Sequence, residues 1–266
     1  MNLTFLGTGA ADFGAELETV YRDAFSTDIR RSSALLVNGT ILIDCGPHTL
    51  HAMEIAGRPQ AAVAHLLITH THDDHFCPAD IAALSRAAGG QLHVYGSPAA
   101  MAALPAEIDP AHRHPMQFGD MNVLDGVTVT ALDANHMGDF PDEQPLHYLL
   151  ESGGRRVLYA TDGAWMCNRT AKRLAHTGLD LWIADCTVGD YTGDLRTFEH
   201  NSMPMLRMME AGLRTRGTLR PDSRILLTHL ARTLHPSHPE TVRIAAGYGY
   251  EVAYDGAEWH LPAADD

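Results

Sequence analysis

Four candidate metal ligands, His70, His72, Asp74 and His75, lie within the six-residue segment His70–His75, which reads His-Thr-His-Asp-Asp-His. The apolar run Leu66–Ile68 comes shortly before it and predicts a buried strand, so the segment follows a strand end, where open α/β folds place their sites. His70 and His72 alternate and can point the same way, while the last two residues of the segment turn in the other direction. One loop can therefore serve two adjacent ions, which predicts a two-metal hydrolase.

Three later residues also follow β-rich apolar runs. These are His136, Asp162 and His229. One histidine or aspartate at a strand end is most often an ordinary polar residue, but three of them in this order indicate a shared site.

The segment His70–His75 resembles the H-x-H-x-D-H signature of the metallo-β-lactamase superfamily, and the three later residues match that family's remaining ligands in order. The resemblance implies an α/β fold, the αββα four-layer sandwich of two facing β-sheets flanked by helices. It also implies a ligand set of His70, His72 and His136 for one ion and Asp74, His75 and His229 for the other, with Asp162 bridging them.

Histidine nitrogen and carboxylate oxygen suit zinc, manganese or iron, and the cluster contains no cysteine that would favour zinc. The expected cofactor is therefore two divalent metal ions, manganese or zinc, with iron left open. Two ions about 3.5–4 Å apart share a water, lower its pKa and stabilise the attacking and departing oxygens of a phosphodiester. Lactone and thioester hydrolysis use the same hydroxide on a carbonyl group, so the ligands alone do not choose the substrate.

The C-terminal third resembles PhnP-type phosphoribosyl 1,2-cyclic phosphate phosphodiesterases. The similarity rests on Glu199–Asn201 and Tyr254–Gly256, with further motifs along most of the chain, such as Leu6–Gly9. In those enzymes the histidine that matches His200 lies beside the substrate phosphate. The resemblance implies that His200 acts in catalysis together with Asp74.

One departure from the PhnP pattern concerns the loop 12–31. PhnP-type enzymes bind an extra structural zinc through cysteines in this loop and a later histidine, whereas this loop has no cysteine and Arg232 stands at the histidine's place. We expect no structural zinc there. We expect instead a flap that faces the substrate, with Arg30 and Arg31 as candidate substrate-binding residues.

The composition sets the outer bounds. The chain has 266 residues, 45% of them hydrophobic, and no linker-like tract, which predicts a single hydrolase domain over residues 1–266. The N-terminus has neither the basic start nor the apolar segment of a signal peptide, and no run is long enough to span a bilayer, so we expect a cytoplasmic protein without a membrane partner. Four scattered cysteines predict no disulfide framework.

The formal net charge of -14 argues against nucleic acid as the main partner, because long-range attraction for a polyanion is poor. The expected partner is a small-molecule phosphodiester, and a homodimer is left open.

The patterns of apolar, turn and capping residues predict alternating strands and helices. Asn38-Gly39 predicts a tight hairpin turn, and Ser237 with Glu240 predicts a capping box. The expected helices cover residues 48–56, 78–87, 98–104, 168–176, 202–215 and 239–248. The expected strands cover residues 3–6, 34–37, 41–44, 66–68, 92–95, 126–132, 147–150, 156–160, 181–184, 224–227 and 251–254.

These observations lead to one function and two alternatives. We expect a dinuclear phosphodiesterase that hydrolyses a small cyclic or activated phosphodiester through a metal-bridging hydroxide. The alternatives are a tRNA 3′-processing-type ribonuclease, for which no basic arm is apparent, and a lactone or thioester hydrolase. A di-iron redox enzyme is disfavoured because that branch has glutamate where His72 stands. Asp44 and Asp185, which end strands, are expected either to orient the metal-bound histidines or to act as conformational caps.

Overall fold

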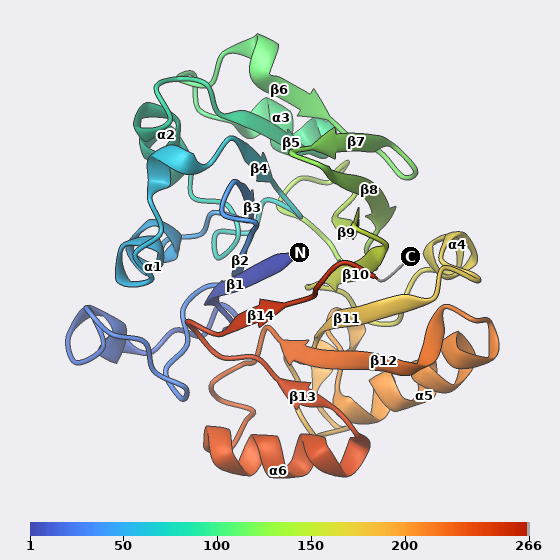
Figure 1. Cartoon of the computed structure of the whole chain (residues 1–266). Coiled ribbons are helices and arrows are strands. Elements are labelled where there is room, and N and C mark those ends of the chain that lie inside the picture. Colours follow the sequence, from blue (N-terminus) through green and yellow to red (C-terminus); the bar gives the residue numbers. More distant parts are fainter. Residues whose placement is uncertain (265–266) are drawn as a thin grey trace.

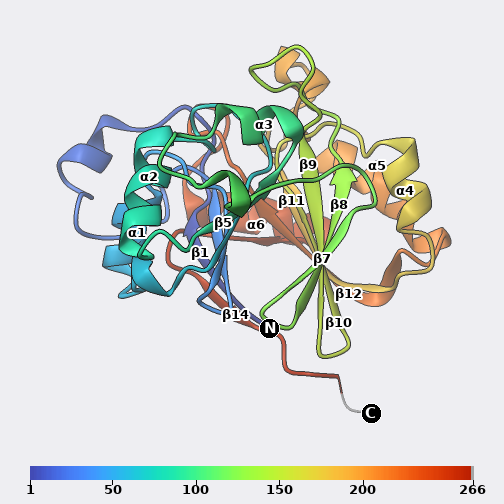
Figure 2. The same cartoon turned by 90° about the horizontal axis from the view of Figure 1, so that it is seen from above.

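Two seven-stranded β-sheets face each other in the computed structural model, which describes residues 1–264, and helices cover their outer faces (Figures 1 and 2). The first sheet has the order β14 (Glu258–His260), β1 (Asn2–Gly7), β2 (Ala34–Val37), β3 (Ile41–Ile43), β4 (His65–Leu67), β5 (His93–Gly96) and β6 (Arg113–Pro115). The second has the order β13 (Glu251–Val252), β12 (Leu219–Thr228), β11 (Leu179–Asp185), β10 (Arg155–Ala160), β9 (Leu146–Ser152), β8 (Val127–Asp133) and β7 (Met121–Leu124). This architecture confirms the expected four-layer α/β sandwich.

The helices divide between the two outer faces. The first sheet packs against α1 (Thr49–Ile55), α2 (Pro78–Ala87) and α3 (Pro98–Ala103), and the second against α4 (Asn168–Arg173), α5 (Met203–Thr215) and α6 (His238–Tyr248). Short 3-10 turns complete the pattern: η1 (Ala15–Glu18), η2 (Gln60–Ala62), η3 (Pro110–His112) and η4 (Leu195–Phe198). None of the helices in residues 1–264 is long and apolar enough to cross a membrane.

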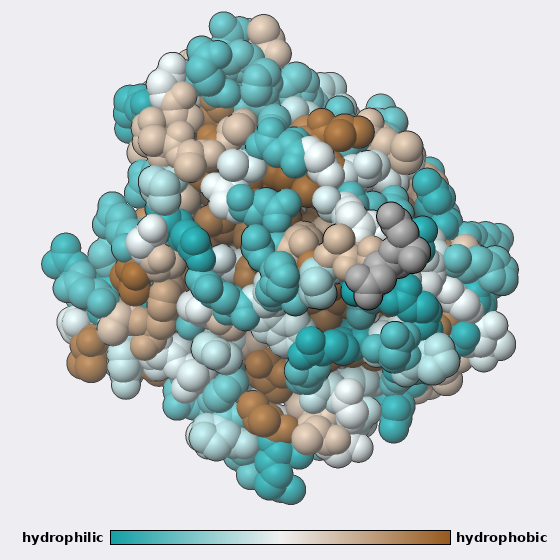
Figure 3. All heavy atoms as spheres, viewed as in Figure 1, coloured by the Kyte–Doolittle hydropathy of each residue, from teal (hydrophilic) through white to brown (hydrophobic). Residues whose placement is uncertain are grey.

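The core lies mainly between the sheets. Successive side chains of a strand point to opposite faces, so Leu35 and Ile43 face the inner core, while Leu36 and Leu42 pack under the helices. Apolar residues on both faces explain why the strand sequences are nearly continuous apolar runs. Figure 3 shows that the face carrying the termini is mostly hydrophilic, with only small apolar patches.

Strand direction places the candidate residues at one end of the sandwich. Strands β3 to β6 run parallel to each other, and so do β10 to β13, which means that their carboxyl ends lie together. Strand β8 runs antiparallel to β9, which runs antiparallel to β10, so β8 has the direction of β10. The loops after β8 and β11 project together from this end, opposite the termini (Figure 2). All of the expected metal ligands follow these strand ends.

The predicted hairpin turn forms in the structure, whereas the predicted helix cap does not. The Asn38-Gly39 turn has positive φ angles of 51° and 80° and joins the antiparallel pair β2 and β3, as predicted. The expected capping box at α6 is wrong, because the Ser237 side chain makes no cap hydrogen bond. The Asp28 carboxylate instead accepts a 2.6 Å hydrogen bond from the backbone N–H of His238. A tertiary contact therefore replaces the local cap.

Candidate metal centre and active site

The residues expected to bind metal ions converge into two adjoining groups. Within each group the donor atoms lie within 4.8 Å of one another, and Asp162 belongs to both. The first group contains His70, His72, His136 and Asp162, and the second contains Asp74, His75, Asp162 and His229. The structure thus brings together all seven residues, in the grouping that the family resemblance implies.

Strained backbone at three strand ends turns these side chains inward. Asp162, His229 and Asp44 have positive φ angles of 52°, 56° and 64°, a conformation that costs free energy for residues other than glycine. Asp44 and His229 lie directly after the last residues of β3 and β12, and Asp162 is the second residue after β10. Such strain concentrates at functional sites, and here it directs side chains from both sheets to one point.

The arrangement of donor atoms fits divalent cations. Imidazole nitrogens face each other at 2.9 Å between His70 Nε2 and His72 Nδ1, and at 3.2 Å between His75 Nε2 and His229 Nε2. The Oδ1 atom of Asp162 is buried without a hydrogen bond, 2.9 Å from His229 Nε2. A cation can bind the lone pairs of these ring nitrogens and of the Asp162 oxygen together. Zinc and manganese both accept this combination of imidazole nitrogen and carboxylate oxygen.

Residues behind the second group orient its histidines. Asp44 Oδ2 accepts a 2.8 Å hydrogen bond from His75 Nδ1. Thr187 Oγ1 donates to Asp185 Oδ1 at 2.9 Å and lies 2.7 Å from His229 Nδ1, from which it accepts. Both bonds leave the Nε2 atoms free to face the centre of the group. The expectation that Asp44 and Asp185 orient histidines is confirmed, the latter acting through Thr187.

Buried carboxylates make this region attractive to cations. Burial opposes a charge on His75, but Asp162, Asp74 and Asp44 outweigh it and raise the pKa of His75 well above its usual range. Burial likewise opposes a charge on His229, yet Asp162 and Asp74 raise its pKa to about 10. Without a metal the site would hold protons, and a divalent ion would displace them.

His200 lies beside the second group. Its Nδ1 atom is 2.7 Å from Asp185 Oδ2, and its ring stacks on the ring of His229 with centroids 5.3 Å apart. Burial lowers the pKa of His200, but the Asp185 carboxylate more than compensates and raises it. The structure therefore places His200 against the expected metal ligands, held in one orientation by Asp185.

A pocket of about 170 Å³ opens over both groups. Its lining includes His200 and also Arg196, from η4, which the sequence analysis did not single out. The available signal was weak, since Arg196 is simply the only basic residue between Asp185 and Glu199. Asp12 also lines this pocket, so the start of the loop 12–31 reaches the site.

The expected substrate-facing role of Arg31 is not supported. Its side chain is 2% exposed and donates hydrogen bonds to the backbone carbonyls of Tyr21, Arg22 and Ala24. Turn η1, in the same loop, projects away from the two sheets (Figure 1). Most of the loop is thus not a flap over the metal ligands, and Arg31 holds it in place.

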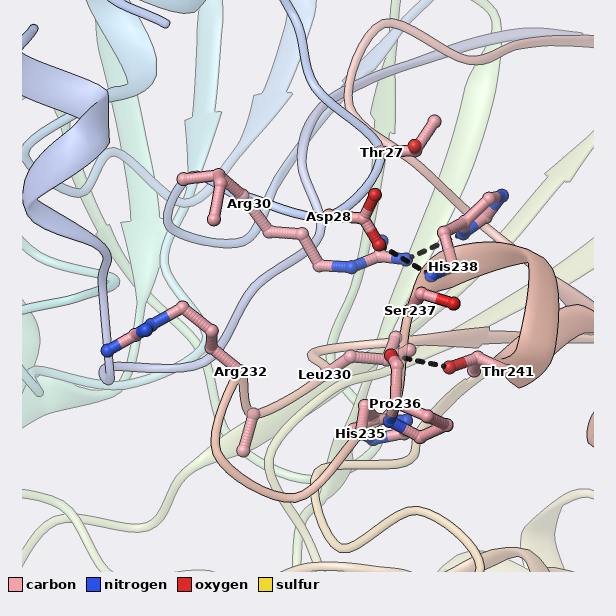
Figure 4. A pocket seen from close by; sticks show the side chains of 12 residues that line it. Thr27, Asp28, Arg30, Leu230, Arg232, His235, Pro236, Ser237, His238 and Thr241 are labelled. Atoms are coloured by element: carbon pink, nitrogen blue, oxygen red, sulfur yellow. Dashed lines mark hydrogen bonds between the residues drawn. The ribbon is translucent and has the colours of Figure 1, made fainter. Parts of the chain in front are cut away.

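Arg30 lies in a neighbouring pocket of about 220 Å³ (Figure 4). Its Nη1 atom donates to Thr8 Oγ1 and to the Ala253 carbonyl, and its Nη2 atom is 3.0 Å from His238 Nδ1. The two pockets share Ala231. Arg30 does not line the pocket over the histidines, and its contacts are those of a structural residue.

Comparison with known proteins defines the family. The chain matches the profile of the beta-lactamase superfamily domain over residues 39–230, and it belongs to this superfamily. A search of curated proteins finds no match. The family, the fold and the two ligand groups together indicate a metal-dependent hydrolase.

Solved structures share the fold over nearly their whole length. A diphosphatase from the PhnP family is 19% identical, with 100% of this chain and 99% of that chain covered and a TM-score of 0.72. The metallo-beta-lactamase fold protein YhfI from Bacillus subtilis is 19% identical, with 97% and 98% covered and a TM-score of 0.70. The short form of human tRNase Z is 20% identical, with 98% and 100% covered and a TM-score of 0.65.

Proposed function

We propose that this protein is a dinuclear metal-dependent phosphodiesterase that hydrolyses a small cyclic or activated phosphodiester. The observation that carries the proposal is the pair of ligand groups that share Asp162, with the Asp185–His200 pair beside them. Manganese or zinc is the expected metal, with iron left open. Two divalent ions bound in these groups would activate a water molecule and stabilise negative charge on the phosphoryl oxygens.

The chain's own residues supply orientation and a proton. Asp44 and Thr187 hold the rings of His75 and His229, which leaves their Nε2 atoms available to a metal ion. Asp185 holds Nδ1 of His200, which leaves Nε2 as the nitrogen that serves the substrate. When the ester bond breaks, the departing alkoxide needs a proton, and we propose that His200 donates it. Asp74 completes the second group and lines the pocket.

The net charge of -14 favours a small substrate over RNA, which keeps the ribonuclease as the weaker alternative. A lactone or thioester hydrolase would use the same ligands, so the substrate must be tested directly.

The test combines metal analysis with a substrate panel. We expect about two transition-metal ions per chain, and hydrolysis of bis(p-nitrophenyl) phosphate and of small cyclic phosphates. A chelator should abolish this hydrolysis, and added manganese or zinc should restore it. Turnover of lactones or thioesters without phosphodiester turnover would replace the proposal with a carbonyl hydrolase. Phosphodiester hydrolysis that is indifferent to chelation would remove the metal-dependent mechanism.

A further inference from the structure

Within residues 1–264, Arg196 is the only lysine or arginine that lines the pocket over the two ligand groups. Three carboxylates, those of Asp12, Asp74 and Asp162, line the same pocket. The histidines and carboxylates account for metal binding, but they do not explain a cation in the wall above them. A guanidinium group in this position is suited to an anionic group on the substrate.

Asp194 holds the Arg196 side chain in one orientation. Its Oδ1 and Oδ2 atoms accept hydrogen bonds from Nε and Nη2 of Arg196, each at 2.8 Å. Asp194 Oδ1 also accepts a 2.8 Å bond from the backbone N–H of Arg196, which caps η4. These bonds lower the pKa of Asp194 to about 2, so the pair stays charged at neutral pH.

Apolar packing does not anchor this turn. Leu195 and Phe198, the first and last residues of η4, are 82% and 78% exposed. Hydrogen bonds to Asp194, rather than apolar contacts, therefore hold the Arg196 side chain at the pocket. They occupy Nε and Nη2 only, and Nη1 makes no hydrogen bond within residues 1–264. One edge of the guanidinium group is fixed and the other remains free for a ligand.

We propose that Arg196 binds the anionic oxygen of a phosphodiester and selects such substrates over neutral esters. This inference rests on the proposed function. A phosphodiester carries a negative charge before the reaction begins, whereas a lactone or simple ester does not. A guanidinium group that is already held in place loses little conformational entropy when it binds a ligand. Its charge-assisted hydrogen bond requires an anionic acceptor, so it adds to the affinity for the phosphodiester and not for a neutral ester. Arg196 is thus a specificity residue that binds substrate directly.

The test uses two substrates with the same leaving group, bis(p-nitrophenyl) phosphate and p-nitrophenyl acetate. In the metal-loaded enzyme, Arg196→Gln should raise the KM for the phosphodiester by about 10–100-fold, the amount expected for one charge-assisted hydrogen bond. The rate constant kcat/KM for the acetate and the metal content should not change. Arg196→Lys should restore part of the affinity, because lysine keeps the positive charge but lacks the planar set of donors of the guanidinium group.

A matched control is available in α6. Arg243 makes the same kind of two-bond pair with Glu240 and does not line the pocket. Arg243→Gln removes one positive charge and one such pair, and it should change neither substrate's kinetics.

Two results would overturn the inference: an equal loss on both substrates after Arg196→Gln, which would indicate a structural role, or no loss on the phosphodiester. The wild-type enzyme could also fail to hydrolyse the phosphodiester, in which case the proposed function fails first. Binding of inorganic phosphate to the metal-loaded protein then tests Arg196 by itself. Weaker phosphate binding in Arg196→Gln, with unchanged binding in Arg243→Gln, would support the anion site, and unchanged binding in both would remove it.

Discussion

Histidines gather in two separate regions of this protein, and the two regions differ in their carboxylates. The site cluster lies beyond the carboxyl ends of the strands. The far cluster lies around the amino ends of β4 and β5 and along β6. The site cluster contains His70, His72, His75, His136, His200 and His229, and the far cluster contains His65, His93, His112 and His114.

Both clusters bring ring nitrogens together. In the far cluster, His93 Nδ1 lies 2.9 Å from His114 Nε2, the same separation as between His70 and His72. Within residues 1–264, however, no group of three donor atoms that could hold a metal ion includes a far-cluster residue. Close histidines are therefore not sufficient for a metal site.

The carboxylates account for the difference. Four buried aspartates, each at most 3% exposed, contact the site cluster and raise the pKa of His75, His200 and His229. They are Asp44, Asp74, Asp162 and Asp185, and the exposed Asp139 lies 3.8 Å from His72. In the part of the chain that the structure describes, one carboxylate lies near the far cluster, that of Asp125, which is 3.6 Å from His65 and 45% exposed. Burial and neighbouring histidines lower the pKa of His93 and His114. Burial also lowers the pKa of His70 and His136, so the two clusters differ at His75, His200 and His229, where the aspartates stabilise a positive charge.

The largest effect should follow from Asp162→Ala. Because Asp162 belongs to both ligand groups, its removal should lower the metal content of both and reduce phosphodiesterase activity more than about 100-fold. Metal analysis and turnover of bis(p-nitrophenyl) phosphate measure the two effects. His93→Asn is the control in the far cluster and should leave both unchanged. Full metal content and activity in the Asp162 variant would rule out a shared ligand.

The next largest effect should follow from His200→Ala. Loss of a general acid typically costs about 10²–10⁴-fold in turnover. The metal content should stay the same, because the seven expected ligands fill both ligand groups without His200. The loss should be smaller for p-nitrophenyl esters, whose leaving group needs little protonation, than for an alkyl alcohol. An equal loss on both would favour phosphate positioning, and no loss on either would make His200 a bystander.

A smaller effect is expected for Asp44→Asn. This change weakens the hydrogen bond that orients His75 without removing a metal ligand. The expected loss is about 10–100-fold in metal affinity or activity. Metal titration of the variant gives the affinity, and excess metal should restore much of the lost activity. If excess metal restores nothing, Asp44 has a role other than holding His75.

The smallest effect concerns the stability of the far cluster at low pH. The folded state lowers the pKa of His93 and His114, so it favours their neutral forms. Their contribution to stability is therefore present above the ordinary histidine pKa of about 6.5 and is lost as the pH falls through the lowered values. Tyr95, His65, His112 and Asp125 are the other ionisable groups that face this pair.

Thermal unfolding at pH 7.5 and pH 5.5 tests this expectation. His114→Gln removes one titrating group, so the variant should lose less thermal stability on acidification than the wild type. The site cluster titrates equally in both proteins and drops out of the comparison. Equal losses in the two proteins would show that the far cluster does not limit acid stability.

Much of the fold and of the ligand set was predictable from the sequence because the signals are local. Long apolar strands such as β8 and β10 have nearly the expected bounds. Strands β6, β7 and β14 were missed because they are short, partly exposed and at or near sheet edges. They are held by pairing with neighbours, and β14 pairs with β1 from the opposite end of the chain. Such pairing leaves little pattern in the strand itself.

The sequence by itself determined the seven candidate metal ligands, because ligand type and position after an apolar strand are readable over a few residues. Tertiary structure alone decided which charged side chains reach the pocket. Arg31 turned inward to backbone carbonyls, while Arg196 lines the pocket wall. Asp28 caps α6 across 210 residues of chain. Asp28 and His238 meet from distant parts of the chain, and Arg31 and Arg196 lie in a loop and a short turn whose paths depend on packing against the rest of the fold. Local patterns of residues do not specify such contacts or loop paths.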